Sequence, residues 1–163
     1  MRHCTKNRYS LLGSIILCFL VLFAAKSYSQ EMRMDRLIKD SETIVVGEVI
    51  KMESRWEEHN NIWTLVTLKC KDFLKGTNKS QIIVRVPGGK IGNKEQGVSG
   101  TPKYQVGETV LNFLGKDSED MYFVNGWEDG KYTLKDGQWI QKNFQYSNQL
   151  ISTVKNIIKN QSK

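Results

Sequence analysis

The chain has 163 residues, of which 24 are Lys or Arg and 17 are Asp or Glu, giving a formal net charge of +7. Hydrophobic residues make up 39% of the chain and aromatic residues 10%, which excludes a disordered protein that cannot bury a core. The charge and the three cysteines are unevenly distributed, because four basic residues and two cysteines lie within the first 29 positions.

Residues 1–29 have the pattern of a secretory signal peptide. Basic residues precede an uncharged apolar run at 11–25, and small residues, Ser27 and Ser29, stand at the −3 and −1 positions before Gln30. A retained membrane anchor is the alternative, but the run is shorter than the roughly 20 residues of a membrane-spanning helix. We expect a secreted or periplasmic protein, cleaved between Ser29 and Gln30, with no stable membrane span afterwards.

The rest of the chain, 30–163, is expected to form one domain of 134 residues, which is 163 less 29. Its net charge is +3 rather than +7, because Arg2, Lys6, Arg8 and Lys26 are removed without any acid. So small an excess does not indicate a nucleic-acid binder. Cys70 is the one cysteine left, which excludes an intrachain disulfide and a zinc site built from cysteine pairs. We expect it to be a small buried side chain.

The first half of this domain is predicted to hold one helix and three strands. Met34, Leu37 and Ile38 have the helical i, i+3, i+4 spacing, within 30–40. β-branched and alternating apolar residues predict strands. Their ranges are 43–52, 62–70 and 81–86. Gly47 in the first strand indicates a bulge or bend of the kind that curls a sheet into a barrel.

The second half begins with 87–107, where six glycines and both prolines predict no regular element. Turns at Asp129-Gly130 and Asp136-Gly137 predict an antiparallel meander. Its strands are expected at 109–114, 121–127, 131–134 and 138–140. Apolar periodicity predicts a C-terminal amphipathic helix at about 147–160 with Ser147 as its N-cap. A membrane-surface helix is the alternative, which two lysines on the polar face support poorly.

Few residues fit a catalytic or metal site. His59 is the only histidine of the domain, and no Gly-flanked nucleophile accompanies it. Asp117, Glu119 and Asp120 lack the ligand order of a calcium loop and are interpreted as a soluble turn. We expect no catalytic residue, no metal and no cofactor, while a hydrolase with paired carboxylates stays open.

The Gly-rich stretch and the tryptophans hold the candidate binding residues. The stretch 86–90 follows a strand, as a phosphate loop does, but lacks the Gly-Lys-Ser/Thr ending. Four tryptophans either pack in the core or stack on sugars, unpaired bases or a protein partner. The candidates are Pro87, Gly88, Gly89, Lys90, Gly100, Pro102, Gly107, Trp63 and Trp127.

Glu108 follows the Gly-rich stretch and opens an otherwise apolar strand. A carboxylate there can accept backbone N–H groups from the loop. We therefore expect Glu108 to be a structural anchor of the loop, and ligand binding is the alternative role.

The segment Asp40-Ser41-Glu42-Thr43-Ile44-Val45-Val46-Gly47-Glu48-Val49 resembles the opening strand of tissue inhibitors of metalloproteinases and other netrin-like modules. Phe73-Leu74-Lys75-Gly76 is similar to the turn after their third strand. Segments 86–89, 99–104 and 106–114 resemble uncharacterised secreted bacterial domains of the same barrel type. The resemblance covers about Asp35 to Leu134.

This resemblance implies a mainly β fold: a small closed antiparallel OB-like barrel over about 41–141, with a short N-terminal helix and a C-terminal amphipathic helix. It implies a binding scaffold without catalytic residues. Gln30-Glu31-Met32 stands where the animal inhibitors carry the Cys-x-Cys that binds the protease zinc, so that mechanism is not implied.

The expected function is a non-enzymatic binding module that uses the Gly-rich loop with Trp63 and Trp127. Its expected partner is a protein or extracellular ligand and not a nucleic acid. A protease inhibitor acting through the loop edge of the barrel is one alternative, and a carboxylate-based hydrolase is another.

Overall fold

The computed structural model describes residues 33–57, 60–76, 78–117, 119, 121–142 and 144–161. The expected signal peptide, its cleavage site after Ser29 and the residues His59 and Asp120 lie outside the described residues. Contacts divide the chain into two units, Met1–Arg36 and Leu37–Lys163. Only the helical residues 33–36 of the first unit are described, and the strands and sites below belong to the second.

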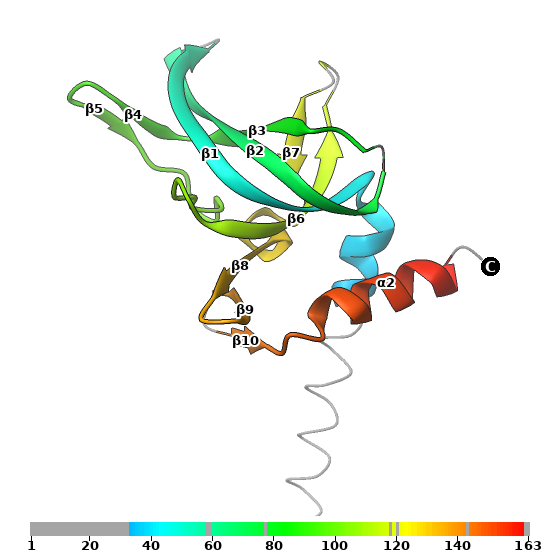
Figure 1. Ribbon diagram of the computed structural model, residues 1–163. Coiled ribbons are helices and arrows are strands. Elements are labelled where there is room, and N and C mark those ends of the chain that lie inside the picture. Colours follow the sequence, from blue (N-terminus) through cyan, green and yellow to red (C-terminus); the bar gives the residue numbers. More distant parts are fainter. Residues whose placement is uncertain are drawn as a thin grey trace, which may run out of the picture. The chain divides into compact units, whose positions relative to one another are not determined.

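The described part of the chain is mainly β, with a short N-terminal helix at 33–40 and a C-terminal helix (Figure 1). This confirms the predicted secondary-structure class. The elements are β1 (Thr43–Glu57), β2 (Asn61–Lys75), β3 (Gln81–Pro87), β4 (Gly89–Ile91), β5 (Lys94–Gln96), β6 (Thr109–Lys116), β7 (Tyr122–Val124), the 3-10 helix η2 (Trp127–Gly130), β8 (Lys131–Lys135), β9 (Gln138–Gln141), β10 (Phe144–Tyr146) and α2 (Leu150–Gln161).

Five strands are joined in a ring of pairings. Their order is β1-β2-β3-β7-β6, and β1 also pairs with β6. These pairs are antiparallel except for β3 and β7, which run parallel and share a single pair, Val84 with Tyr122. β8, β9 and β10 extend the sheet beyond β6, whereas β4 and β5 form a separate hairpin that projects from it (Figure 1).

A bend in β1 allows this strand to serve two neighbours. Its first part pairs with β6, while almost its whole length pairs with β2. The β1–β2 register shifts between Val46 and Gly47, and a Cβ at Gly47 would lie 3.0 Å from the carbonyl oxygen of Lys69. The predicted bulge at Gly47 is therefore confirmed, and the missing side chain lets the two strands approach closely.

The main hydrophobic cluster joins the strands of the ring. All its members except Tyr104, which lies in the loop before β6, come from strands and share one face, as the two-residue period of a strand requires. They are Val45, Val49, Val66, Leu68, Ile82, Val84, Val86, Tyr104, Val110, Leu114 and Tyr122. β6 is buried on its other face too, where the ring of Phe113 lies 5.8 Å from that of Tyr132. Burial on both faces explains why the sequence from Val110 to Leu114 is apolar except for the buried Asn112.

The Gly-rich stretch differs from the prediction, because it contains the β4–β5 hairpin. Gly89 pairs with Gln96, and the chain turns at Gly92-Asn93, where Gly92 has a φ of 60°. The expectation of no regular element was wrong for this part of the stretch. The glycines stand at the entry and turn of the hairpin, where positive φ is needed, rather than throughout its strands.

The segment after β6 also differs. The strand predicted at 121–127 is limited to β7, and the expected hairpin turn at Asp129-Gly130 lies within η2. Positive φ angles at Gly126 (68°) and Trp127 (57°) redirect the chain between them. β7 and β8 consequently pair with successive parts of the same edge of β6, whose other edge pairs with β1. The meander is confirmed for β8 and β9, which turn at Asp136-Gly137.

The C-terminal helix is confirmed, with a later start than predicted. α2 begins at Leu150, and the hydroxyl of Ser147 accepts the N–H of Gln149 at 3.3 Å in the preceding turn. Leu150 and Val154 are buried, as their spacing predicts. β10 precedes this turn and was not predicted. Among the described helices, none has the length and apolar character needed to cross a membrane.

Candidate functional site

A pocket of about 310 Å³ lies where β3 and β7 stop pairing. Its walls come from β2, β3, β7, η2 and the loop before β6. The lining residues are Trp63, Arg85, Val86, Pro87, Pro102, Phe123, Val124, Asn125, Gly126 and Trp127. The structure therefore brings together four of the predicted binding residues, namely Trp63, Pro87, Pro102 and Trp127.

Three aromatic side chains line this pocket. Trp127 is 53% exposed and Phe123 is 38% exposed. Trp63 is half-buried on β2, opposite Pro87 of β3. Large rings bury much apolar area when they are covered, as the buried Trp139 illustrates. Exposed rings that share one pocket are a feature of interaction surfaces.

Local contacts hold Trp127 at the rim of the pocket. Its φ of 57° is unusual for a residue with a side chain and costs about 1–2 kcal/mol. The next N–H, of Glu128, donates to the carbonyl of Gly100 at 2.9 Å, which ties η2 to the Gly-rich loop. A Cβ at Gly130 would collide with the carbonyl of Asn125, so only glycine fits at the end of η2. Such surrounding contacts maintain the strained backbone of Trp127.

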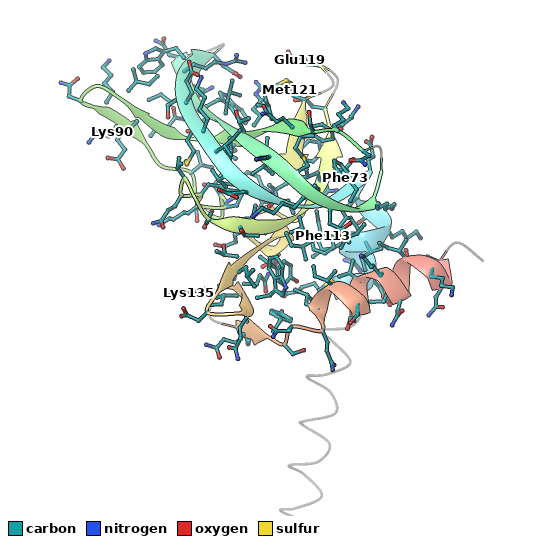
Figure 2. All side chains as sticks on the ribbon, viewed as in Figure 1. Phe73, Lys90, Phe113, Glu119, Met121 and Lys135 are labelled. Atoms are coloured by element: carbon teal, nitrogen blue, oxygen red, sulfur yellow. The ribbon has the colours of Figure 1, made fainter. Side chains whose placement is uncertain are left out.

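Arg85 forms the polar wall of the pocket. The centre of its guanidinium lies 4.3 Å from the ring centroid of Trp63. It also pairs with the carboxylates of Glu57, Asp117 (3.3 Å) and Glu119 (3.4 Å). Figure 2 shows Glu119 at the tip of the connection between β6 and β7. Stacking and ion pairing together hold the guanidinium against the indole.

A second cavity, of about 420 Å³, shares Val86, Pro87 and Pro102 with the pocket. It lies beside the β4–β5 hairpin. Three more predicted residues, Gly88, Gly89 and Lys90, line this second cavity and not the first. Figure 2 shows Lys90 on the projecting hairpin.

Gly89 fixes how the hairpin joins the main sheet. Its φ is 145°, and a Cβ there would lie 2.5 Å from the hydroxyl of Ser54 and closer still to that of Thr64. The Thr64 hydroxyl donates to the carbonyl of Gly88 at 2.7 Å. The side chain of Gln96 accepts the N–H of Ile62 at 2.7 Å. Backbone and side-chain contacts together attach the hairpin to β2.

The last two predicted loop residues shape the loop without lining either cavity. Gly100 and Gly107 have φ angles of 78° and 91°. The N–H of Gly107 donates to the carbonyl of Val49 at 2.8 Å. Gly107 therefore turns the chain from the loop into β6.

Glu108 contacts the Gly-rich loop that it was predicted to anchor. Its Oε1 accepts the N–H of Gln105 at 3.0 Å and the ammonium of Lys131 at 2.7 Å. Lys131 also donates to the carbonyl of Lys103 and lies 4.5 Å from the ring centroid of Tyr104. Lys131 was not predicted as part of this cluster, because only the β6–β8 pairing brings it to the loop.

Burial shifts the pKa values of two groups in this cluster. It lowers the pKa of Lys131, which the hydrogen bond and charge of Glu108 partly oppose. Burial also raises the pKa of Tyr104, and the charge of Glu108 acts in the same direction. The hydroxyl of Tyr104 donates to Oδ1 of Asn112 at 2.9 Å, inside the protein. The cluster is thus a buried polar network that fixes the loop.

The pocket offers stacking surfaces and hydrogen-bonding groups. Its lining residues include no carboxylate, histidine or cysteine. Within the described ranges, no group of three or more such residues is placed to hold a metal ion. Cys70 is partly buried, and burial raises the pKa of its thiol.

Two important lining residues were missed from the sequence. Arg85 alternates with Val84 and Val86, so the strand pattern does place it on the outer face. Phe123 gave no such signal, because its exposure depends on how β7 ends.

Comparison with protein-family models finds no match, and comparison with curated proteins finds no significant match. The geometry of the pocket therefore carries the functional argument.

Proposed function

We propose that this chain is a secreted or periplasmic, non-enzymatic binding module whose ligand occupies the pocket between β3, β7 and η2. The observation that carries this proposal is the convergence of Trp63, Phe123 and Trp127. These residues come from three separate segments, and two of them are more than one-third exposed. Exposed aromatic anchors that share one pocket are typical of binding sites.

The scaffold we propose is a closed, netrin-type OB-like barrel. The five-strand ring that returns to β1 supports it, because an OB-fold is a five-stranded Greek-key barrel. OB-folds bind ligands on their second and third strands and on the loops between strands one and two and strands four and five. Trp63 and Arg85 lie on the second and third strands of the ring, and Glu119 lies between its fourth and fifth strands.

Fluorine NMR of protein labelled with 5-fluorotryptophan tests the pocket directly. The protein, expressed from the 163-residue sequence, is mixed with fractions of the medium and envelope of the cells that produce it. We expect one fraction to shift the signals of Trp63 and Trp127. The signals of Trp56, which is exposed outside the pocket, and of buried Trp139 act as internal controls.

Two outcomes contradict the proposed site: no fraction shifts the pocket signals, or the Trp56 signal shifts equally. Trp127→Ala is expected to weaken binding by about tenfold or more, whereas Trp56→Ala leaves it unchanged. Mass spectrometry of the exported protein tests cleavage between Ser29 and Gln30 in the same preparation.

A further inference from the structure

We propose that the pocket binds an extended polypeptide segment and receives a basic side chain, lysine or arginine, among its aromatic rings. The inference rests on the proposed function and specifies its ligand class. Three features carry it: the charges at the rim, the backbone carbonyls in the walls, and the exposed rings.

The ion pairs around Arg85, which lines the pocket on its β-strand side, have an excess of negative charge. Glu57 pairs with both Arg55 and Arg85, and Arg85 also pairs with Asp117 and Glu119. Among the described side chains of this ion-pair network, three carboxylates therefore face two guanidiniums. Arg85 lies in the wall, but its charge is more than matched, so an incoming anion meets net repulsion and an incoming cation net attraction.

The η2 side of the rim repeats this charge balance. Lys142 pairs with Glu128 at 2.9 Å and with Asp129 at 2.8 Å. These two carboxylates directly follow Trp127 in the chain, and the three side chains sum to one negative charge. A cation beside Trp127 is therefore favoured from both sides of the pocket.

The carbonyl of Pro87 faces the gap between β3 and β7. In an antiparallel ladder, the N–H and C=O of one residue point to one neighbour, and those of the next residue point the opposite way. The N–H of Gly88 donates to the carbonyl of Ile62 at 2.8 Å, so Gly88 points toward β2 and Pro87 points away from it. The Pro87 carbonyl has no hydrogen-bond partner within the described part of the chain.

The carbonyl of Val124 faces the same gap from the other strand. The N–H of Asn125 donates to the carbonyl of Phe113 at 2.9 Å, so Asn125 points toward β6 and Val124 points toward β3. The next rung of the parallel ladder would need the N–H of residue 87, which proline lacks. Pro87 thus ends the ladder after one pair and leaves two acceptors toward the pocket.

Extended polypeptide matches this arrangement better than a free amine does. Its backbone N–H groups supply donors for strand-edge carbonyls, as in β-strand addition. Its basic side chain supplies a cation for the faces of Trp127 and Phe123, where cation–π attraction is strongest for indole. The pocket volume of about 310 Å³ is at the lower end for ligand sites and suits one long side chain with its backbone.

Calorimetric titration with defined probes tests the inference on the protein expressed from the 163-residue sequence. The probes are acetyl-Ala-Leu-Lys-Leu-Ala-amide, the same peptide with Glu in place of Lys, the Lys peptide with N-methylated backbone, spermidine, and cellotetraose. We expect the Lys peptide to bind at least about tenfold more tightly than the Glu peptide. N-methylation of its backbone should weaken its binding by a similar factor. Its affinity should fall as salt is added.

Charge reversal at the rim supplies the matched variants. Glu119 is 70% exposed, so Glu119→Lys should leave folding intact. It should lower the affinity for the Lys peptide and raise the affinity for the Glu peptide, each by about threefold to tenfold. Glu95→Lys on the projecting hairpin is the control and should change neither affinity.

Equal affinity for the two peptides, or no binding of the Lys peptide, would overturn the inference. Spermidine binding as tightly as the Lys peptide would assign the site to free amines instead. Cellotetraose binding while no peptide binds would assign it to saccharides. In these cases a fraction that shifts the Trp127 fluorine signal would still support the proposed function, so the two failures are distinguishable.

Discussion

The ammonium of Lys131 lies 2.7 Å from Oε1 of Glu108, and this ion pair joins β8 to the loop before β6. The two side chains are only 9% and 14% exposed. Breaking a buried pair is costly because one charge stays buried without its partner. Through the carbonyl of Lys103 and the N–H of Gln105, the pair also fixes the loop that carries Pro102 into the binding pocket.

Glu108→Ala should therefore destabilise the protein by about 3–5 kcal/mol, because it leaves the Lys131 ammonium buried. The double variant Glu108→Gln with Lys131→Met should recover much of this loss. Urea unfolding followed by tryptophan fluorescence measures both. Lys51→Ala is the control, since its pair with Glu53 is well exposed and should contribute little to stability. A Glu108→Ala cost as small as that of the control would contradict a structural role for the buried pair.

Tyr104→Phe should cost about 1–3 kcal/mol, because Oδ1 of buried Asn112 loses the donor it has at 2.9 Å. Nδ2 of Asn112 already lacks a partner in the described part of the structure. The variant keeps the ring and its packing, so unfolding measurements report the hydroxyl alone. An unchanged unfolding free energy would show that water replaces the Tyr104 hydroxyl as the donor to Asn112.

The stability difference between wild type and Tyr104→Phe should also depend on pH. The folded-state pKa of Tyr104 is raised above the ordinary value of 10.0, mainly by burial, so its contribution to stability is present below pH 10 and is lost as the pH rises further. The difference in unfolding free energy between wild type and Tyr104→Phe should consequently narrow above pH 10. Parallel unfolding curves at pH 8 and above pH 10 measure this, and a constant difference would exclude the effect.

Gly89→Ala should destabilise the protein by about 1–3 kcal/mol and detach the β4–β5 hairpin, because the φ of 145° is strained for alanine and the new methyl meets the Ser54 hydroxyl. Gly97→Ala is a matched control, since no atom lies within 4 Å of its added Cβ and its φ is not in the left-handed region. Hydrogen exchange of the hairpin amides should accelerate in the first variant only. Equal protection in the two variants would contradict the role given to Gly89.

Cys70 should react slowly with iodoacetamide at pH 8. Burial raises the pKa of its thiol, so the fraction present as reactive thiolate is below that of an exposed cysteine. Peptide mapping by mass spectrometry assigns the alkylation to Cys70. Alkylation should accelerate strongly in denaturing urea, and a native rate equal to the denatured rate would show that Cys70 is accessible.

The sequence predicts those features that depend on local periodicity. Alternating apolar residues in β2 and β3 identify their buried faces, and the spacing of Leu150 and Val154 identifies the buried face of α2. Glycine chemistry predicts the bulge at Gly47 and the turn at Asp136-Gly137. In each case the residues that determine the structure are close in the chain, so their pattern is visible without the fold.

The hairpin in the Gly-rich stretch and the 3-10 helix after β7 were not predictable in this way. The hairpin depends on Gln96 bonding to Ile62, and η2 depends on a hydrogen bond from Glu128 to Gly100. Both contacts join residues far apart in sequence. Composition alone therefore indicated an irregular loop and a strand at these positions.

The candidate site likewise depends partly on local sequence patterns and partly on the tertiary structure. The sequence by itself determined that the domain is mainly β, that Trp63 and Trp127 are candidates and that Glu108 can fix a loop. Only the tertiary structure decided that Trp63, Arg85 and Trp127 share one pocket and that Lys131 is the partner of Glu108. The physical reason is that the order of strands in the ring sets these distances, and strand order follows from long-range pairings that no local pattern encodes.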